Sequence, residues 1–161
     1  MRKLLYDRIS AVNYAKKWAY DRNPKYYNFD KLGGDCTNFV SQCIFAGSLI
    51  MNYKPITGWY FNSLHDRAPA WTGVKFLYNF LINNDGVGPF GKINSLVNLN
   101  IGDVIFLRRR DNSFYHSLIV TNKVNDEYFV SSHTIDGFNR PLFSYNLNNA
   151  VYLSIEGVNT K

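Results

Sequence analysis

The chain has 161 residues, of which 46% are hydrophobic and 19% charged, and it carries a formal net charge of +6 at pH 7. This length suits a single domain, residues 1–161, with a hydrophobic core of its own, and the composition excludes disordered and collagen-like chains. The positive charge favours an acidic partner through long-range attraction. Because no nucleic-acid-binding motif accompanies it, we expect no nucleic acid among the partners.

The first predicted element is a helix whose inward residues recur at helical spacing: Ala11, Tyr14, Ala15, Trp18 and Ala19. Asn23-Pro24 is predicted to end it. The start of the chain lacks the apolar run of a secretory signal, and no apolar stretch is long enough to span a bilayer. We therefore expect no membrane insertion, and a cytoplasmic location unless a leader has been removed, in which case the cell wall or the extracellular space is expected.

Residues 33–40 read GGDCTNFV and place a cysteine where the next apolar helix begins. Unpaired N–H groups and the positive end of a helix dipole stabilise negative charge at such a position. A lowered pKa and a thiolate nucleophile are therefore expected at Cys36. Gly33-Gly34 would allow a tight turn and the close approach of a substrate, and Asp35 is predicted to cap the helix.

The second cysteine, Cys43, lies in the same predicted helix, which runs from about residue 36 to 46 with Gly47 as its stop. Seven helical residues separate two Cα atoms by about 10.5 Å, and a disulfide needs less than about 7 Å. Both thiols are therefore predicted to be free, which indicates a reducing compartment or a thiol kept for chemistry. Cys43 is interpreted as a small core residue.

Residues 48–71 form a long irregular stretch that carries several aromatic side chains and His65, interpreted as a spectator. Trp59 is a candidate for the wall of a substrate groove, and an equal alternative is that it covers the core. Thr72 is predicted to cap a third helix, whose apolar stripe consists of Val74, Leu77, Tyr78, Leu81 and Ile82.

From residue 84 onward the sequence consists of short runs of β-branched and aromatic residues separated by Gly and Asn. Strands are predicted at 104–107, 117–121, 127–132, 141–145 and 150–155. Short turns between them favour antiparallel pairing, and helices followed by strands indicate an α+β fold. The basic run Arg108–Arg110 is interpreted as a solvated turn.

A cysteine nucleophile needs a base, and the chain has three histidines. His116 begins one predicted strand and His133 ends the next. A two-residue turn at 124–125 or 125–126 would put both on one face of the sheet, so that His133 could orient the His116 ring, whereas an even register would separate them. Asp136 and Ser131 are the alternative orienting residues.

The motifs GGDCTNFVSQCIFAG, WYF, PAWTGVKFLYNFL, LNIGDVIFL, YHSLIVT and SSHTID occur in this order along the chain. This sequence resembles the bacterial putative amidase domain family, within the papain-like cell-wall cysteine peptidases and amidases, from about Tyr6 to Tyr145. The resemblance implies a papain-like fold with N-terminal helices packed on a C-terminal antiparallel sheet. By position it implies Cys36 as nucleophile, His116 as general base and His133 as the third catalytic residue.

The resemblance further implies a polar residue upstream of the cysteine that assists the oxyanion, for which Tyr26, Tyr27 and Asn28 remain open. With Asp35 and Trp59, Tyr27 completes the predicted substrate-binding set. The expected reaction is hydrolysis of an amide in peptidoglycan, or in another peptide or amide substrate, through a thioester. Alternatives are an acyltransferase or transamidase, a non-catalytic wall- or peptide-binding domain, and a basic nucleic-acid binder. No cofactor is expected, and no metal, because zinc-binding spacings are absent.

Overall fold

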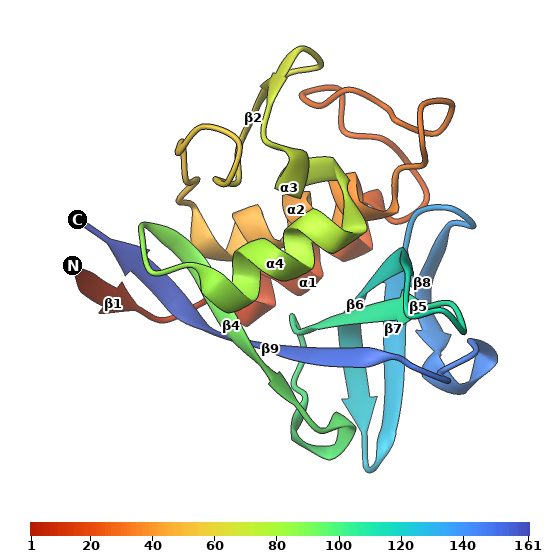
Figure 1. Ribbon diagram of the computed structural model, residues 1–161. Coiled ribbons are helices and arrows are strands. Elements are labelled where there is room, and N and C mark those ends of the chain that lie inside the picture. Colours follow the sequence, from red (N-terminus) through yellow and green to blue (C-terminus); the bar gives the residue numbers. More distant parts are fainter.

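A computed structural model describes residues 1–161 and has an α+β architecture, with most helices preceding a mainly antiparallel sheet (Figure 1). The helices are α1 (Arg8–Trp18), α2 (Cys36–Ser48), α3 (Pro69–Thr72) and α4 (Val74–Asn83), with single 3-10 turns η1 (Leu96–Asn98) and η2 (Leu142–Ser144). The strands are β1 (Arg2–Leu4), β2 (Phe61–Ser63), β3 (Asp66–Arg67), β4 (Gly88–Asn94), β5 (Val104–Arg108), β6 (Phe114–Val124), β7 (Glu127–Ser132), β8 (Gly137–Pro141) and β9 (Val151–Thr160).

The main sheet has seven antiparallel strands in the order β1-β9-β5-β6-β7-β8, and β4 pairs with β9. Strands β5 to β8 follow one another as hairpins, as the short turns predicted. Because β1 and β4 both pair with β9, the two chain termini lie beside each other at one edge of the sheet (Figure 1). The small hairpin β2-β3 stands apart from this sheet.

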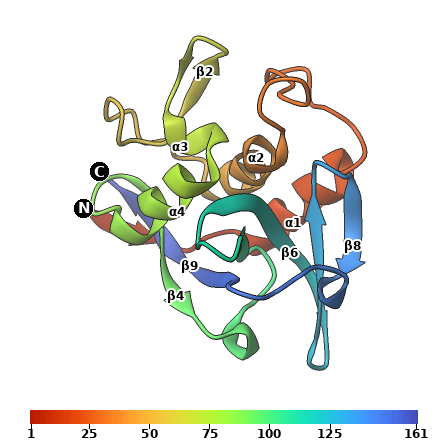
Figure 2. The same ribbon diagram turned by 45° about the vertical axis from the view of Figure 1, so that its right-hand side comes forward.

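Helix α2 is the central helix: α1 packs on one side of it, α3 and α4 on the other, and β6 runs beneath it (Figure 2). Eleven of its 13 residues are buried, because apolar and small residues occupy every face. The core between the helices and the sheet includes Phe39, Ile44, Trp71 and Ile119. A smaller core covers the opposite face of the sheet and is built from Leu99, Ile105, Leu107, Leu118, Val120, Tyr128, Val130 and Leu142.

The β6-β7 hairpin changes register partway along its length. At the turn, Val124 pairs with Glu127, which fits the two-residue turn Asn125-Asp126. A bulge between Val120 and Asn122 then shifts the pairing, so that Ile119 faces Ser131. This shift converts the odd register expected from the turn into an even one. Residues 116 and 133 consequently belong to opposite faces of the sheet, which corrects the prediction that they share one.

Several predicted boundaries differ from the structure. α1 ends at Trp18, five residues before Asn23-Pro24. In the run 141–145, Pro141 ends β8 and Leu142–Ser144 form the turn η2 instead of a strand. α2 continues through Gly47 and ends where Leu49 adopts a left-handed conformation with φ of 56°. Gly47 is needed for packing, since a Cβ there would lie 2.5 Å from the Tyr6 ring.

The predicted strands over 104–107, 117–121 and 127–132 lie within observed strands, and the strand predicted at 150–155 begins one residue later, at Val151. The Arg108–Arg110 segment leads into the exposed turn between β5 and β6, as predicted. No helix has both the length and the hydropathy needed to cross a membrane.

Candidate active site

Cys36 is the first residue of α2 and is 8% exposed. Its Sγ atom lies 3.7 Å from Oγ1 of Thr37, and this Oγ1 lies 3.0 Å from Oγ of Ser117 in β6. The hydroxyl pair attaches the start of the helix to the strand that carries His116. No spacing pattern in the sequence signals this contact, because Thr37 and Ser117 are 80 residues apart.

Burial raises the pKa of the Cys36 thiol above its ordinary value of 9.0. Hydrogen bonding from the Ser117 backbone and from Thr37 opposes the rise without reversing it. This corrects the expectation of a thiolate with a lowered pKa, because loss of water around the sulfur outweighs the hydrogen bonds that favour the thiolate. Both cysteines are free, as predicted, and Cys43 is fully buried in the core.

His116 lies near the start of β6, directly opposite Leu107 of β5. Leu107 belongs to the smaller core, so the His116 side chain points to the face of the sheet away from α2. Its ring lies between those of Tyr115 and Tyr145, with centroids 6.4 and 6.1 Å away. Burial, and secondarily the charge of Arg140, lower the pKa of His116 to about 4, so the resting imidazole is neutral.

The His116 ring nitrogens have no hydrogen-bond partner. Ser48 Oγ is the one fully buried side-chain polar atom that lacks a partner, so the imidazole nitrogens keep some exposure to solvent. In this conformation no ring nitrogen is hydrogen-bonded to the Cys36 sulfur. The two side chains lie on different sides of β6, and the backbone of Ser117, the residue next to His116, helps to lower the pKa of the thiol.

His133 is fully buried and has a different set of neighbours from the predicted one. Nδ1 lies 2.5 Å from Oδ2 of Asp35, and Nε2 lies 2.8 Å from the Trp18 carbonyl oxygen. The ring also stacks on Phe39 of α2 at a centroid distance of 4.1 Å. Both ring nitrogens are thus occupied by oxygen partners. His133 therefore has no nitrogen left to orient His116.

Asp35 precedes α2, but its side chain does not cap the helix. Its Oδ1 accepts hydrogen bonds from the Phe29 backbone N–H at 2.8 Å and from Asn38 Nδ2 at 2.9 Å. With His133 on Oδ2 and Arg22 Nε 3.6 Å away, the carboxylate is enclosed and only 1% exposed. The cap prediction was wrong, because Asp35 turns back to hold the preceding loop. This burial also leaves its carboxylate unable to contact a substrate.

The alternative orienting residues have other partners as well. Asp136 forms an ion pair with Arg22 at 2.9 Å. The hydroxyl of Ser131 lies 2.8 Å from that of Thr121 and accepts a hydrogen bond from the Asn139 N–H. Neither side chain is hydrogen-bonded to His116.

Trp59 is fully buried, stacks against Phe80 and donates its indole N–H to Ser41 Oγ at 3.0 Å. It belongs to the core, which corrects its assignment to a groove wall. Tyr27, by contrast, is 42% exposed, and its ring packs edge-on against Phe29.

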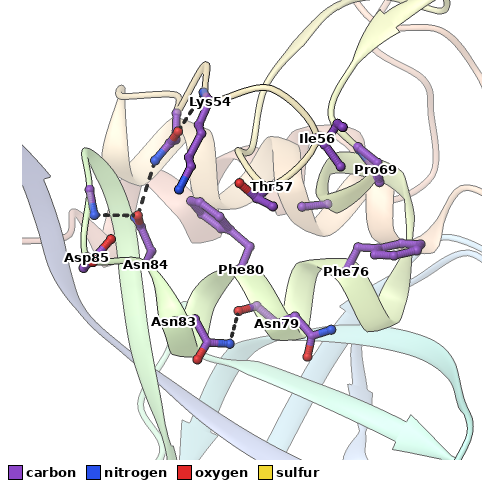
Figure 3. A pocket seen from close by; sticks show the side chains of 13 residues that line it. Lys54, Ile56, Thr57, Pro69, Phe76, Asn79, Phe80, Asn83, Asn84 and Asp85 are labelled. Carbon is purple, nitrogen blue, oxygen red and sulfur yellow. Dashed lines mark hydrogen bonds between the residues drawn. The ribbon is translucent and has the colours of Figure 1, made fainter.

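A pocket of about 550 Å³ lies between the loop carrying Lys54 and Thr57 and one face of α4, with Phe80 at its centre (Figure 3). Cys36 and His116 are not among the residues that line it. The candidate active site therefore does not coincide with this cavity. No group of three or more His, Cys, Asp or Glu side chains is placed to bind a metal ion.

Comparison with known proteins adds independent information. Residues 5–155 match the family described as "Putative amidase domain". Two similar relatives come from Bacillus subtilis (strain 168): "Uncharacterized protein YhbB" is 35% identical over 125 residues, which cover 76% of this chain and 39% of the relative. "Uncharacterized protein YjcM" is 31% identical over 146 residues, which cover 84% and 32%. This chain thus spans less than half the length of either relative, and no solved structure matches it.

Proposed function

Because this chain belongs to the putative amidase domain family, we propose that it is a cysteine-dependent amidohydrolase. The proposed substrate is an amide bond of peptidoglycan, in a stem peptide or at the lactyl-amide link to the glycan. The proposed fold is a variant of the papain-like arrangement, with the nucleophile at a helix start and the base on the adjacent sheet. Hydrolysis is the reaction class that the family suggests, and the remaining details are our inference.

The start of α2 lies against β6, and this arrangement is the main support for the proposal. The Cys36 thiol contacts Thr37 and the Ser117 backbone, and Ser117 is the residue next to His116. A nucleophile and a neutral imidazole thus lie on different sides of β6, at neighbouring positions along this strand. The His116 ring has no hydrogen bond to break, and the proposed mechanism requires that the start of β6 rearrange on substrate binding so that this ring reaches the sulfur. Catalytic hydrogen bonds of free enzymes commonly tighten only in the substrate complex.

In the proposed mechanism, the thiol transfers its proton to His116 as the sulfur attacks the amide carbonyl. The raised pKa of the Cys36 thiol and the low pKa of His116 make this transfer part of the attack and not a prior ionisation. The first N–H groups of α2 have no partner within the helix and can stabilise the oxyanion. His116 then protonates the leaving amine, and a water activated by His116 hydrolyses the thioester to a carboxylate and the free thiol.

His133 has a positioning role in this proposal. Through Asp35 it connects the end of β7 to the residue before the nucleophile, and through the Trp18 carbonyl to the end of α1. The buried contacts fix where α2 begins and hence where the Cys36 sulfur lies. His133 would thus act on the nucleophile's position and not on the tautomer of His116.

Digestion of purified peptidoglycan tests the proposal. The wild-type chain and Cys36→Ala are incubated with peptidoglycan, and the released fragments are identified by mass spectrometry. Cys43→Ala serves as the matched control, because it removes the other free thiol from the core. We expect the wild-type chain and the control to release fragments with new amine and carboxyl ends, and Cys36→Ala to release none while remaining folded.

The same digestion separates the proposal from its alternatives. Conjugates formed after adding an amine acceptor, without hydrolysis, would indicate a transferase. Peptidoglycan binding that Cys36→Ala retains, with no cleavage by the wild-type chain, would indicate a binding domain. Affinity for nucleic acid that falls steeply with salt and is unchanged in Cys36→Ala would indicate a nucleic-acid binder.

A further inference from the structure

We propose that the surface beside His116 recognises a carboxylate of the substrate through Arg109 and Arg140, which makes an acidic peptide the preferred substrate. The inference deepens the proposed function, because it places this recognition next to the proposed base. It rests on the stacking of each arginine against a tyrosine that flanks His116. It rests equally on the absence of any carboxylate that pairs with either guanidinium.

On one side of His116, the Arg109 guanidinium lies 5.0 Å from the centroid of the Tyr115 ring. The Tyr115 ring in turn lies nearly parallel to the imidazole, at an interplanar angle of 17°. Arg109 is exposed, and its one side-chain hydrogen bond goes to Ser113 Oγ at 3.5 Å. The Tyr115 ring therefore has both an exposed guanidinium and the imidazole as neighbours.

On the other side, the Arg140 guanidinium lies 5.9 Å from the centroid of the Tyr145 ring, which is the second neighbour of His116. Nη1 donates to the Tyr145 hydroxyl at 3.1 Å, and Nη2 donates to the Asp136 carbonyl oxygen at 2.9 Å. These hydrogen bonds fix a half-buried guanidinium beside the site. Its charge also reaches His116, since it contributes to the lowered pKa of that residue.

Neither arginine has a carboxylate within salt-bridge distance, although the chain forms ion pairs elsewhere. The carboxylate of Asp136 pairs with Arg22, and that of Asp111 accepts hydrogen bonds from Ser113. Neither guanidinium is therefore paired in a salt bridge, although the charge of Arg109 contributes, after the hydrogen bonds from Ser113, to the lowered pKa of Asp111. A partly buried cation without an ion-pair partner is unfavourable in the free protein. A substrate carboxylate that pairs with this cation removes the penalty and is therefore bound more tightly.

A carboxylate is the anion that fits this surface in a peptide substrate. The planar guanidinium forms paired hydrogen bonds with carboxylates, and the tyrosine stacking holds its plane in place. The overall charge of +6 adds attraction for an acidic substrate before contact. A neutral carboxamide of the same shape would gain neither the paired hydrogen bonds with a guanidinium nor the long-range attraction. The surface should therefore distinguish glutamate from glutamine in an otherwise identical peptide.

The experiment measures kcat/KM for two peptides that contain the scissile amide and differ only in one glutamate or glutamine next to it. Arg109→Gln and Arg140→Gln are compared with the wild-type chain. Lys123→Gln is the matched control, because Lys123 also stacks over a tyrosine, Tyr128, on a strand end away from His116. Binding of both peptides to Cys36→Ala gives a readout that does not need turnover.

We expect the wild-type chain to prefer the glutamate peptide roughly 10- to 100-fold, from hydrogen bonds to charged groups. Each arginine substitution should reduce this preference about tenfold and weaken its dependence on salt. Lys123→Gln should leave the preference unchanged, and Arg109→Lys should restore part of it. Cleavage that depends on Cys36 but treats both peptides alike would overturn this inference alone. Preferential binding of the glutamate peptide with no cleavage would support the inference and overturn the proposed hydrolase.

Discussion

Nδ1 of His133 lies 2.5 Å from Oδ2 of Asp35, the residue that directly precedes Cys36. Both side chains are at most 2% exposed, so this contact joins the end of β7 to the start of α2 within the protein interior. Removing one partner of a buried charged pair leaves the other without compensation and is strongly destabilising. The contact therefore predicts a structural effect for His133 that a surface histidine does not have.

We predict that His133→Ala lowers the free energy of unfolding by about 3 kcal/mol. The exposed His65, which has no hydrogen bond from its ring, provides the control, and His65→Ala should change stability by less than about 0.5 kcal/mol. Urea unfolding of the two variants measures the difference. Equal stability of the two would show that the buried contact does not hold the start of α2. A rise in KM together with a fall in kcat would fit the positioning role.

The second prediction concerns pH and His116, whose pKa is lowered from 6.5 to about 4 in the folded chain. Between these values the unfolded chain binds a proton that the folded chain does not, so stability falls as the pH drops through this window. The contribution is fully present above pH 6.5 and amounts to about 3 kcal/mol. His116→Gln should lack this pH-dependent contribution. The difference in free energy of unfolding between variant and wild type should therefore change between pH 7 and pH 4. A constant gap would contradict the burial of the imidazole.

The third prediction tests whether Trp59, which is fully buried, belongs to the hydrophobic core or to the wall of a substrate groove. Trp59→Ala should lower the free energy of unfolding by roughly 3–5 kcal/mol, because it leaves a cavity and an unpaired Ser41 hydroxyl. Tyr27→Ala, at an exposed aromatic residue, should stay within about 0.5 kcal/mol of the wild type. Thermal and urea unfolding measure both. If Trp59→Ala lost substrate affinity without losing stability, Trp59 would instead belong to the wall of a substrate groove.

The fourth prediction concerns the reactivity of the two thiols. Burial raises the pKa of both, and Cys43 lies deeper, so neither is a thiolate at neutral pH. Alkylation of the folded chain by iodoacetamide should be slow at pH 6, rise at Cys36 only above about pH 9, and spare Cys43 throughout. Peptide mapping by mass spectrometry locates the label. Rapid labelling of Cys36 at pH 6 would mean that its thiol is ionised at rest after all.

Local patterns predicted the elements that position the site. The apolar helix after Asp35 and the strand runs over 104–107 and 117–121 appear where periodicity and β-branched residues indicated. These features depend on neighbours in sequence, so sequence reading reaches them. The free state of both cysteines followed in the same way from helical spacing.

Contacts between distant residues were beyond sequence reading. The bulge between Val120 and Asn122 reverses the face of His133 relative to His116, and no turn residue signals it. β4 was missed because Gly88, Pro89 and Gly91 obscure its pattern, and it forms through pairing with β9, about 60 residues away. Arg140 reaches Tyr145 and the surroundings of His116 only after β8 has joined the sheet.

The proposed mechanism passes through a covalent thioester on Cys36, which the mass of the intact protein would reveal. The chain is mixed with a peptidoglycan stem peptide, quenched with acid within seconds and measured by mass spectrometry. We predict an added mass equal to the acyl part of the peptide, located on Cys36 by fragmentation, absent in Cys36→Ala and retained in Cys43→Ala. An adduct on another residue, or substrate turnover by Cys36→Ala, would contradict the account.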